Sequence, residues 1–210
     1  MNKPINNAVP TVSVVDDDPA VLKSLKRLLR SANLKVETFS SPQEFLARRD
    51  PGTPGCLVLD VAMPGLNGLE LQEALAATGD EWSIVFLTGH GDIPTSVKAM
   101  KGGAADFLTK PVKADDLLKA VRSAIENDGI RRQARAEIDE IRERIATLTP
   151  REREVLAYVI SGRLNKQIAG ELGTVEKTVK VHRAHVMEKM RVRSVADLVR
   201  LAEREGIRPK

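Results

Sequence analysis

Short, mostly apolar runs alternate with amphipathic stretches along the first 125 residues of the chain. Runs of this kind are typical of strands that are buried on both faces of a parallel sheet. We expect such strands at residues 12–15, 35–39, 57–59, 84–87 and 105–109. Each run is followed by apolar residues at helical spacing, so the pattern predicts a doubly wound, flavodoxin-like α/β domain of five parallel strands and five helices.

Capping residues mark where the predicted helices begin. Ser41-Pro42-Gln43-Glu44 is a capping box with proline at the first helical position. The other helices of this domain are expected to begin at Pro19, at Leu66, after Asp92 and near Ala114. The helix from Leu66 to Ala77 is long enough to serve as a crossover between two parallel strands.

A charged helical stretch, residues 128–147, follows this domain. Ile138, Ile141 and Ile145 recur in it at spacings of three and four, which makes a narrow apolar seam on a polar helix. The seam fits a short coiled coil, and it fits equally a helix that packs on a neighbouring domain. We expect a helical linker that sets the distance between domains, with a kink or an end of the preceding helix at Asn127-Asp128-Gly129.

The final segment, residues 148–208, has the pattern of an all-α domain of four helices. Thr149-Pro150-Arg151-Glu152 is a second capping box and opens the first of them. Asn165 and Thr174 are expected to cap two further helices that a tight glycine turn joins, and Ser194 begins the last. Two short helices joined by a tight turn form a helix-turn-helix, whose second helix suits the major groove of a duplex.

Charge divides the chain unevenly. Residues 1–128 contain 14 Lys and Arg against 17 Asp and Glu, a net charge of −3, whereas residues 129–210 contain 19 against 12, a net charge of +7. A basic C-terminal part indicates a polyanionic partner. Only 3% of the residues are aromatic, which is too few for stacking on single strands, so we expect a double-stranded nucleic acid.

Cysteine content and hydropathy indicate where such a protein works. The single cysteine, Cys56, excludes an internal disulfide and fits a reducing compartment, where it is expected to be a buried apolar residue. The sequence has no run of about 18 apolar residues and no charged-then-apolar leader. We therefore expect a cytoplasmic protein without a membrane partner.

Polar side chains stand at the ends of four predicted strands. In an open parallel sheet, ligands bind beyond these carboxyl ends. Neighbouring carboxylates repel one another unless a cation neutralises them, and Mg²⁺ prefers carboxylate, water and phosphate oxygens, so this edge can hold a metal ion and a phosphoryl group. Alternatively, Asp60 alone fits a turn cap, and Asp18 fits a helix cap instead of a metal ligand. The strand-end residues are Asp16, Asp17, Asp60, Thr88 and Lys110.

This ordered set resembles the receiver domain of two-component response regulators, over residues 10–127. Met63-Pro64-Gly65 after the central acid and Lys110-Pro111 match the same family. The resemblance implies that Asp60 is the phosphoacceptor and that the cofactor is Mg²⁺ or Mn²⁺. The implied metal ligands are Asp16, Asp17, Asp60 and the backbone carbonyl of Ala62.

The same resemblance implies a switch, and the residue types beside the switch predict a dimer interface. Thr88 and Lys110 contact the phosphoryl group, and Phe107 stands where many receivers have tyrosine. Movement of Thr88 toward the phosphoryl group opens space for the Phe107 ring, as in similar receivers. The outward surface of the helix after Thr88 and of the strand that carries Phe107 is then expected to change. It contains a mixed apolar and basic patch suited to a two-fold contact, formed by Val97, Met100, Lys101 and Phe107.

Residues 148–205 resemble the helix-turn-helix domain of LuxR-type regulators. The matching motifs are Leu148–Leu156, Asn165–Ala169 and Thr178–His182. Together with the receiver and with Thr88-Gly89-His90-Gly91-Asp92, the chain is similar to response regulators of the FixJ/NarL type. The resemblance implies base contacts by Lys180 and Val181. The other DNA contacts that it implies are Lys166, Lys177, Thr178, His182 and Lys189.

These resemblances predict a transcription factor in which phosphorylation of Asp60 by a sensor histidine kinase gates dimerisation and DNA binding. We expect RNA polymerase as a further partner and no enzymatic activity beyond phosphotransfer to itself and slow dephosphorylation. One rival is an aspartate-dependent phosphohydrolase, a class that typically needs a second acid where Ala62 stands. Another is a structural DNA-binding protein, which the complete set of strand-end residues argues against.

Overall fold

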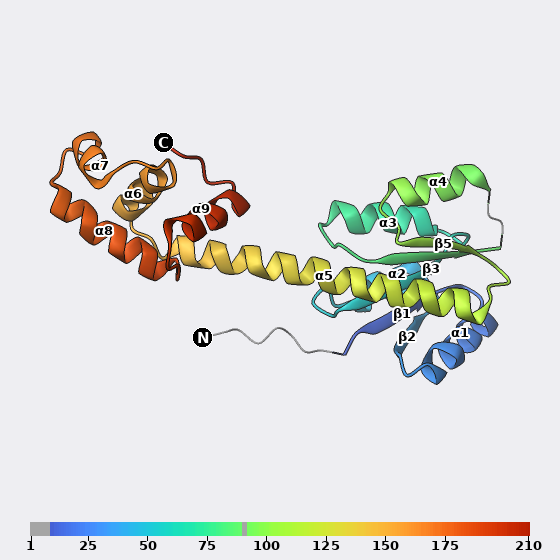
Figure 1. Ribbon diagram of the computed structural model, residues 1–210. Coiled ribbons are helices and arrows are strands. Elements are labelled where there is room, and N and C mark those ends of the chain that lie inside the picture. Colours follow the sequence, from blue (N-terminus) through green and yellow to red (C-terminus); the bar gives the residue numbers. More distant parts are fainter. Residues whose placement is uncertain (1–8, 90–91) are drawn as a thin grey trace. The chain divides into compact units, whose positions relative to one another are not determined.

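The computed structural model describes residues 9–89 and 92–210. Its first part is a five-stranded parallel sheet in the order β2-β1-β3-β4-β5, with helices on both faces (Figure 1). Each strand lies within two residues of its expected position, and the predicted doubly wound α/β fold is confirmed. The strands are β1 Thr11–Val15, β2 Lys35–Phe39, β3 Gly55–Asp60, β4 Ile84–Thr88 and β5 Asp106–Thr109.

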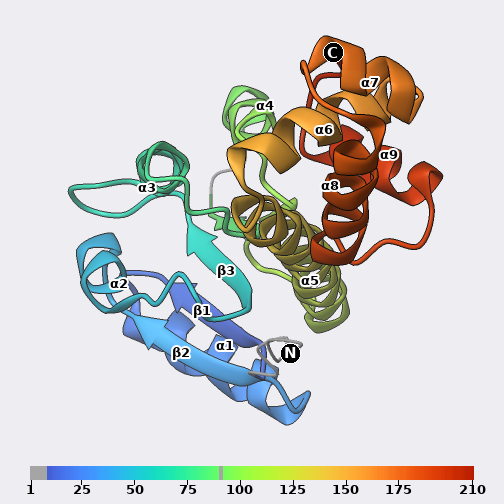
Figure 2. The ribbon, with the colours of Figure 1, turned by 90° about the vertical axis from the view of Figure 1, so that its left-hand side faces the viewer.

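Helices bury both faces of this sheet (Figures 1 and 2). α1 and α5 cover one face, where Leu29 and Val121 pack with Val58. α2, α3 and α4 cover the other, where Phe45 and Leu71 belong to the core. The faces are therefore closed, and the carboxyl ends of the strands stay open for chemistry. The helices are α1 Pro19–Ser31, α2 Pro42–Arg48, α3 Gly68–Ala77, α4 Ile93–Lys101 and α5 Ala114–Ala146.

The C-terminal helices form a second core. Val179 and Val186 of α8 are buried with Val155 of α6 and Ile168 of α7. α8 thus packs against both of these helices, as Figure 2 shows. The predicted four-helix arrangement with a helix-turn-helix is confirmed. The helices are α6 Pro150–Ile160, α7 Asn165–Glu171, α8 Glu176–Lys189 and α9 Val195–Arg204.

Side-chain caps begin most helices at the residues that the sequence indicates. Asp92 accepts a hydrogen bond from the backbone N–H of Thr95 at 2.7 Å and starts α4. Thr149 and Glu152 form the complete, reciprocal capping box of α6. Ser194 caps α9. These boundaries depend on hydrogen bonds three residues apart, so local sequence is enough to predict them.

Two expected caps are wrong by one residue. α7 begins at Asn165 itself, and the carbonyl oxygen of the Asn165 side chain accepts a hydrogen bond from Arg183 on α8 at 3.1 Å. The side-chain oxygen of Asn165, which was expected to cap α7, is thus bonded to Arg183 instead. α8 begins at Glu176 after Val175, and not after Thr174. The difference at α7 reflects a contact with α8, which the local pattern does not contain.

The helix end or kink expected at Asn127-Asp128-Gly129 is wrong as an end, because α5 runs through these residues without interruption. The carboxylate of Asp128 is buried and accepts hydrogen bonds from the backbone N–H of Gly55 and from Arg132. Asp128 is therefore held inside the helix by long-range partners and does not start a turn. The predicted linker residues up to Ala146 are helical as expected.

The chain divides into two compact units, Met1–Arg132 and Gln133–Lys210. The end of α5 belongs to the second unit, where Ile141 is buried and Ile145 is partly buried in the core. The apolar seam thus packs on the helical domain, which decides between the two interpretations of its spacing. Within the described residues, no helix has the length and apolar character needed to cross a membrane.

Candidate functional site

Three carboxylates meet at the carboxyl ends of β1 and β3. These two strands are paired, with Val15 opposite Leu59, so the acids that follow them lie side by side. One oxygen from each of Asp16, Asp17 and Asp60 lies within 4.8 Å of the others. Asp16 and Asp60 are buried, whereas Asp17 is exposed. The sequence prediction that these residues form one cluster is confirmed by this geometry.

Lys110 supplies the positive charge of the cluster. Its Nζ lies 2.6 Å from an oxygen of Asp16 and 3.3 Å from Oδ1 of Asp60. The lysine is placed by β5, and its backbone N–H donates to the carbonyl of Thr88 at 2.7 Å. Burial by itself lowers the pKa of this ammonium, but the hydrogen bond to Asp16 and the charge of Asp60 outweigh it and raise the pKa. The group is therefore a cation at neutral pH.

Asp60 has a carboxylate oxygen that the surrounding protein does not fully satisfy. Burial raises the pKa of Asp60, nearby Lys110 opposes that rise, and the charge of Asp16 adds to it. Among the described residues, no group donates a hydrogen bond to buried Oδ1, although Lys110 is at ion-pair distance. A buried, unbonded carboxylate oxygen beside two further carboxylates is the donor set that a hard divalent cation prefers.

The remaining strand-end residues surround this cluster. Thr88 ends β4 and is buried. The partly buried ring of Phe107 packs against Phe86, with ring centroids 6.1 Å apart. Gly68 begins α3 directly beside the backbone of Asp60. A Cβ at this position would lie 2.2 Å from the Asp60 carbonyl oxygen, so only glycine fits there. His90, another residue of the matching motif, lies outside the described residues.

Asp18 is a helix cap and not a member of the cluster. Its side chain accepts a hydrogen bond from the backbone N–H of Ala20 at 2.7 Å and begins α1. Asp16 in turn accepts a hydrogen bond from the backbone N–H of Asp18 at 3.0 Å. The backbone at the start of α1 therefore orients Asp16. Of the two roles considered for Asp18, helix cap or metal ligand, the structure shows the helix cap.

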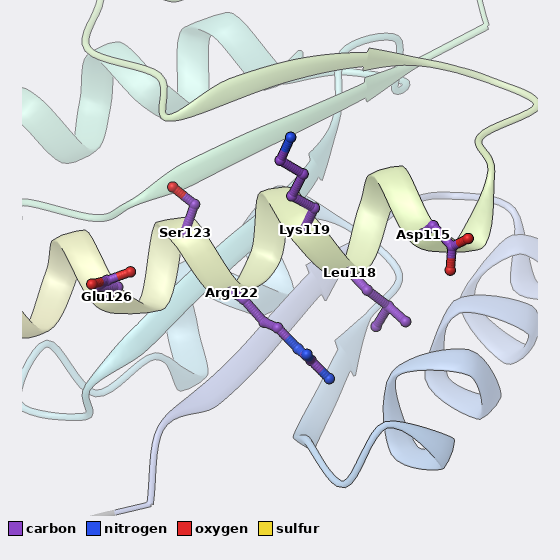
Figure 3. A pocket seen from close by; sticks show the side chains of 6 residues that line it. All are labelled: Asp115, Leu118, Lys119, Arg122, Ser123 and Glu126. Carbon is purple, nitrogen blue, oxygen red and sulfur yellow. The ribbon is translucent and has the colours of Figure 1, made fainter.

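A hollow of about 560 Å³ lies along α5 (Figure 3). Its lining side chains spread apart from one another and carry charges of both signs. None of them belongs to the acidic cluster. The hollow is therefore a solvated face of one helix and not part of the site. The lining residues are Asp115, Leu118, Lys119, Arg122, Ser123 and Glu126.

The exposed face of α8 carries the second candidate site. Val179, Val186 and Met190 are buried toward α6 and α7, and the opposite side faces solvent. Val181 is 49% exposed there, on the side of α8 opposite the buried Val179 and Val186. Lys166, Lys177 and Lys180 are exposed, while Thr178 and His182 are partly buried.

Lys189 differs from the other candidate DNA contacts. Its Nζ lies 2.6 Å from Oε2 of Glu152, a buried side chain of α6, and 3.2 Å from the carbonyl oxygen of Thr147. The hydrogen bond from Lys189 lowers the pKa of Glu152 to about 2, against the effect of burial. Sequence reasoning missed this ion pair, since the partners are far apart in the chain and belong to different helices.

The face of α4 that was expected to form a dimer contact is exposed. Val97 is 44% exposed and Met100 is 49% exposed, and Lys101 lies beside them at the end of the helix. Ile93, one turn before Val97, is also exposed and extends the apolar stripe. Only Ala99 of this helix is buried against the sheet.

Two family models match the chain. Residues 12–122 match the response regulator receiver domain, and residues 146–202 match the bacterial regulatory proteins of the luxR family. The chain belongs to the response regulators that join these two domains. This response regulator is therefore a transcription regulator with a receiver domain and a LuxR-type DNA-binding domain, and the family resemblance drawn from the sequence is confirmed.

Known proteins similar to this response regulator span nearly its whole length. Nodulation protein W of Bradyrhizobium diazoefficiens is 50% identical over 196 residues, which are 93% of this chain and 86% of that protein. The transcriptional regulatory protein FixJ of Azorhizobium caulinodans is 45% identical over 201 residues, 94% of both chains. The solved structure of the response regulator StyR matches with a TM-score of 0.86 and 52% identity, over 93% of this chain and 99% of StyR.

Proposed function

We propose that phosphorylation of Asp60 controls DNA binding by this response regulator. One observation carries the proposal: three carboxylates and a lysine converge at the strand ends, and a buried oxygen of the Asp60 carboxylate accepts no hydrogen bond from the part of the chain that the structure describes. That arrangement leaves Asp60 available as a nucleophile next to a cation-binding position. A basic helix in the DNA-binding domain then supplies the output.

Mg²⁺ or Mn²⁺ fits the residues at this site. Asp16, Asp17, Asp60 and the backbone carbonyl of Ala62 would hold it, since hard cations take oxygen ligands and Mg²⁺ keeps water and phosphate oxygens in its shell. When bound, the ion supplies the positive charge that lets an anionic phosphoryl donor approach three carboxylates. Lys110 adds a second positive charge at Asp60.

The proposed chemistry is a phosphoryl transfer onto the protein itself. A carboxylate oxygen of Asp60 attacks the phosphorus of a phosphohistidine on the sensor kinase. The P–O bond forms as the P–N bond breaks, and the departing imidazole keeps the electron pair and takes up a proton. Slow attack of water on the aspartyl phosphate releases inorganic phosphate and returns the Asp60 carboxylate, which ends the phosphorylated state.

Thr88 and Phe107 connect this chemistry to the surface. A phosphoryl group on Asp60 offers new acceptor oxygens to the hydroxyl of Thr88 and to the ammonium of Lys110. Inward movement of Thr88 opens space for the partly buried ring of Phe107, which lies on the neighbouring strand β5. The α4 face with Val97, Met100 and Lys101 then pairs with a second copy through an isologous contact.

DNA binding is proposed for the exposed face of α8. Lys180 and Val181 contact base edges in the major groove, and Lys166, Lys177, Thr178 and His182 lie toward phosphates. For Lys189, which was expected to contact a phosphate, the ion pair with Glu152 favours a role inside the domain. A contact with RNA polymerase and a location in the cytoplasm complete the proposal.

Intact-protein mass spectrometry tests the phosphorylation site. The wild type, incubated with acetyl phosphate and Mg²⁺, is expected to gain the mass of one phosphoryl group, and chelation of the metal prevents the gain. Asp60→Asn removes the nucleophile and is expected to gain nothing, whereas the matched control Asp18→Asn changes an acid that only caps α1. A phosphorylated Asp60→Asn protein would show that the proposed phosphoacceptor is wrong.

A further inference from the structure

A buried charged cluster joins α5 to the opposite end of β3 from Asp60. Asp128 is only 2% exposed, and its Oδ2 accepts hydrogen bonds from the backbone N–H of Gly55 at 2.9 Å and from Nε of Arg132 at 2.7 Å. A buried carboxylate is costly unless it is paired and hydrogen-bonded. Both conditions are met here by groups that have no part in the phosphorylation site.

Arg132 extends this cluster onto the loop before β3. Its guanidinium donates to the backbone carbonyls of Gly52 at 3.1 Å, of Pro51 at 3.2 Å and of Thr53 at 2.8 Å. One side chain thus bonds three successive carbonyls and a carboxylate at the same time. Only the planar fork of arginine presents enough donors for this, and lysine is not an equivalent replacement.

The start of β3, which accepts these contacts, is fixed in place by its packing against β1. Gly55 has a φ of +143°, and a Cβ at this position would lie 1.9 Å from the carbonyl oxygen of Thr11 on β1. The first residue of β3 must therefore be glycine, pressed against the neighbouring strand, with its N–H aimed at Asp128. Every residue of β3 is buried. We call Asp128 and Arg132, with the Pro51–Gly55 backbone they bind, the Asp128–Arg132 clamp.

The part of α5 after the clamp has little support of its own. All side chains from Gln133 to Ala136 are exposed, and packing resumes with partly buried Ile138 and buried Ile141. Gly129, which lies between the two clamp residues, also weakens the helix, since glycine within a helix costs about 1 kcal/mol relative to alanine. A short exposed helix is marginal in water without tertiary contacts. This exposed segment therefore stays helical only if tertiary contacts fix the helix on both sides of it. On the receiver side these contacts are those of the clamp.

We propose that the Asp128–Arg132 clamp is a positioning element, which keeps the connection between the two domains helical and so sets one preferred spacing of the DNA half-sites. The inference rests on the proposed function, because it concerns paired binding by phosphorylated copies. A stiff connection presents the second DNA-binding domain at a limited set of separations, whereas a flexible one spreads it over many and lowers its effective concentration at each.

Gel-shift titrations with the phosphorylated full-length protein test this inference. The probes are duplexes with two copies of a half-site, obtained by selection from random DNA, at spacings varied one base pair at a time. For the wild type we expect the best and worst spacings to differ in affinity by about tenfold or more. Asp128→Asn and Arg132→Lys should reduce that ratio to about threefold or less, with unchanged affinity for a single half-site. Asp139→Asn, an exposed change on the same helix, should keep the wild-type profile.

Hydrogen exchange of the backbone amides at residues 129–137 gives an independent measurement. Loss of the clamp should accelerate exchange there by about tenfold or more, while the phosphoryl uptake of the receiver stays the same. Variants with the wild-type spacing profile and wild-type exchange would overturn the inference, as would a wild type that prefers no spacing. A wild type that gains no affinity from phosphorylation on any duplex would instead refute the proposed function, and the exchange measurement would still decide the role of the clamp.

Discussion

The ammonium of Lys189, near the end of α8, donates a hydrogen bond to the buried carboxylate of Glu152 in the first turn of α6, with the two atoms 2.6 Å apart. Glu152 also accepts a hydrogen bond from the backbone N–H of Thr149. Nδ1 of His185 lies 3.5 Å from the other carboxylate oxygen. The helix proposed to read DNA is thus tied at one end to the helix that begins the domain.

Lys189→Met should therefore lower the stability of the DNA-binding domain more than it alters DNA contacts. Breaking a buried ion pair leaves an uncompensated charge and costs roughly 3–5 kcal/mol, and we expect about 2–3 kcal/mol because Lys189 is 34% exposed. The salt dependence of DNA binding should stay unchanged. If the slope of the logarithm of the binding constant against the logarithm of the salt concentration instead falls by about one, with little loss of stability, Lys189 is a phosphate contact.

The same carboxylate predicts a dependence of stability on pH. The pKa of Glu152 is lowered from 4.5 to about 2 in the folded protein, chiefly by the hydrogen bond from Lys189. The unfolded chain therefore binds more protons between these pH values, so the stabilisation is complete above about 4.5 and is lost as the pH falls toward about 2. Urea unfolding of wild type and Glu152→Gln should show a difference in unfolding free energy that shrinks as the pH falls from about 4.5 to about 2. A difference that stays constant over this pH range would contradict the ion pair between Glu152 and Lys189.

Lys110→Met tests the electrostatics of the acidic cluster. The ammonium lies within 3.3 Å of two of the three carboxylates and repels a divalent cation bound to them. Its removal should strengthen Mg²⁺ binding by at least about 2 kcal/mol, because two unit charges about 4 Å apart repel by about 1 kcal/mol even in bulk water, and here a divalent ion lies beside buried carboxylates. Titration calorimetry of the receiver's Mg²⁺ affinity at neutral pH measures this effect. Unchanged or weaker Mg²⁺ binding would mean that Lys110 does not act on the metal position through its charge.

Val97→Asp tests the proposed dimer face of α4. A charge on this exposed apolar stripe should prevent pairing of phosphorylated receivers, because it would be buried unpaired at an isologous contact. Sedimentation with acetyl phosphate should show a dimer for the wild type and a monomer for the variant, with equal phosphoryl uptake. Ser123→Asp places the same charge on the exposed side of α5 and should dimerise normally. The opposite pattern would place the interface on α5.

Local patterns predict much of this molecule, since many of its features depend on neighbours in the chain. The strands, the caps at Asp92 and Thr149, and the order of polar residues at the strand ends follow from alternation and spacing. Convergence of Asp16 and Asp60 also follows, because parallel strands share one carboxyl edge.

The wrong and missed features depend on partners far apart in sequence. Asp128 continues a helix that it was expected to end, because Gly55, 73 residues away, donates a hydrogen bond to it. In the sequence, nothing distinguishes Lys189 from a solvent-exposed lysine. Its partner Glu152 is 37 residues away, and only the packing of α8 against α6 brings the two together. Opposite charges at Asp128 and Arg132, four residues apart on one helix face, were the one local signal of the clamp.

The affinity of the full-length protein for DNA, with and without phosphorylation, tests the central claim most directly. On a duplex selected from random sequence, acetyl phosphate and Mg²⁺ should raise the affinity of the wild type by about tenfold or more, because pairing makes the second half-site contact intramolecular. Asp60→Asn should bind this duplex like the unphosphorylated wild type under both conditions. A wild type phosphorylated at Asp60 without any gain in affinity, or an Asp60→Asn protein with the full gain, would contradict the account.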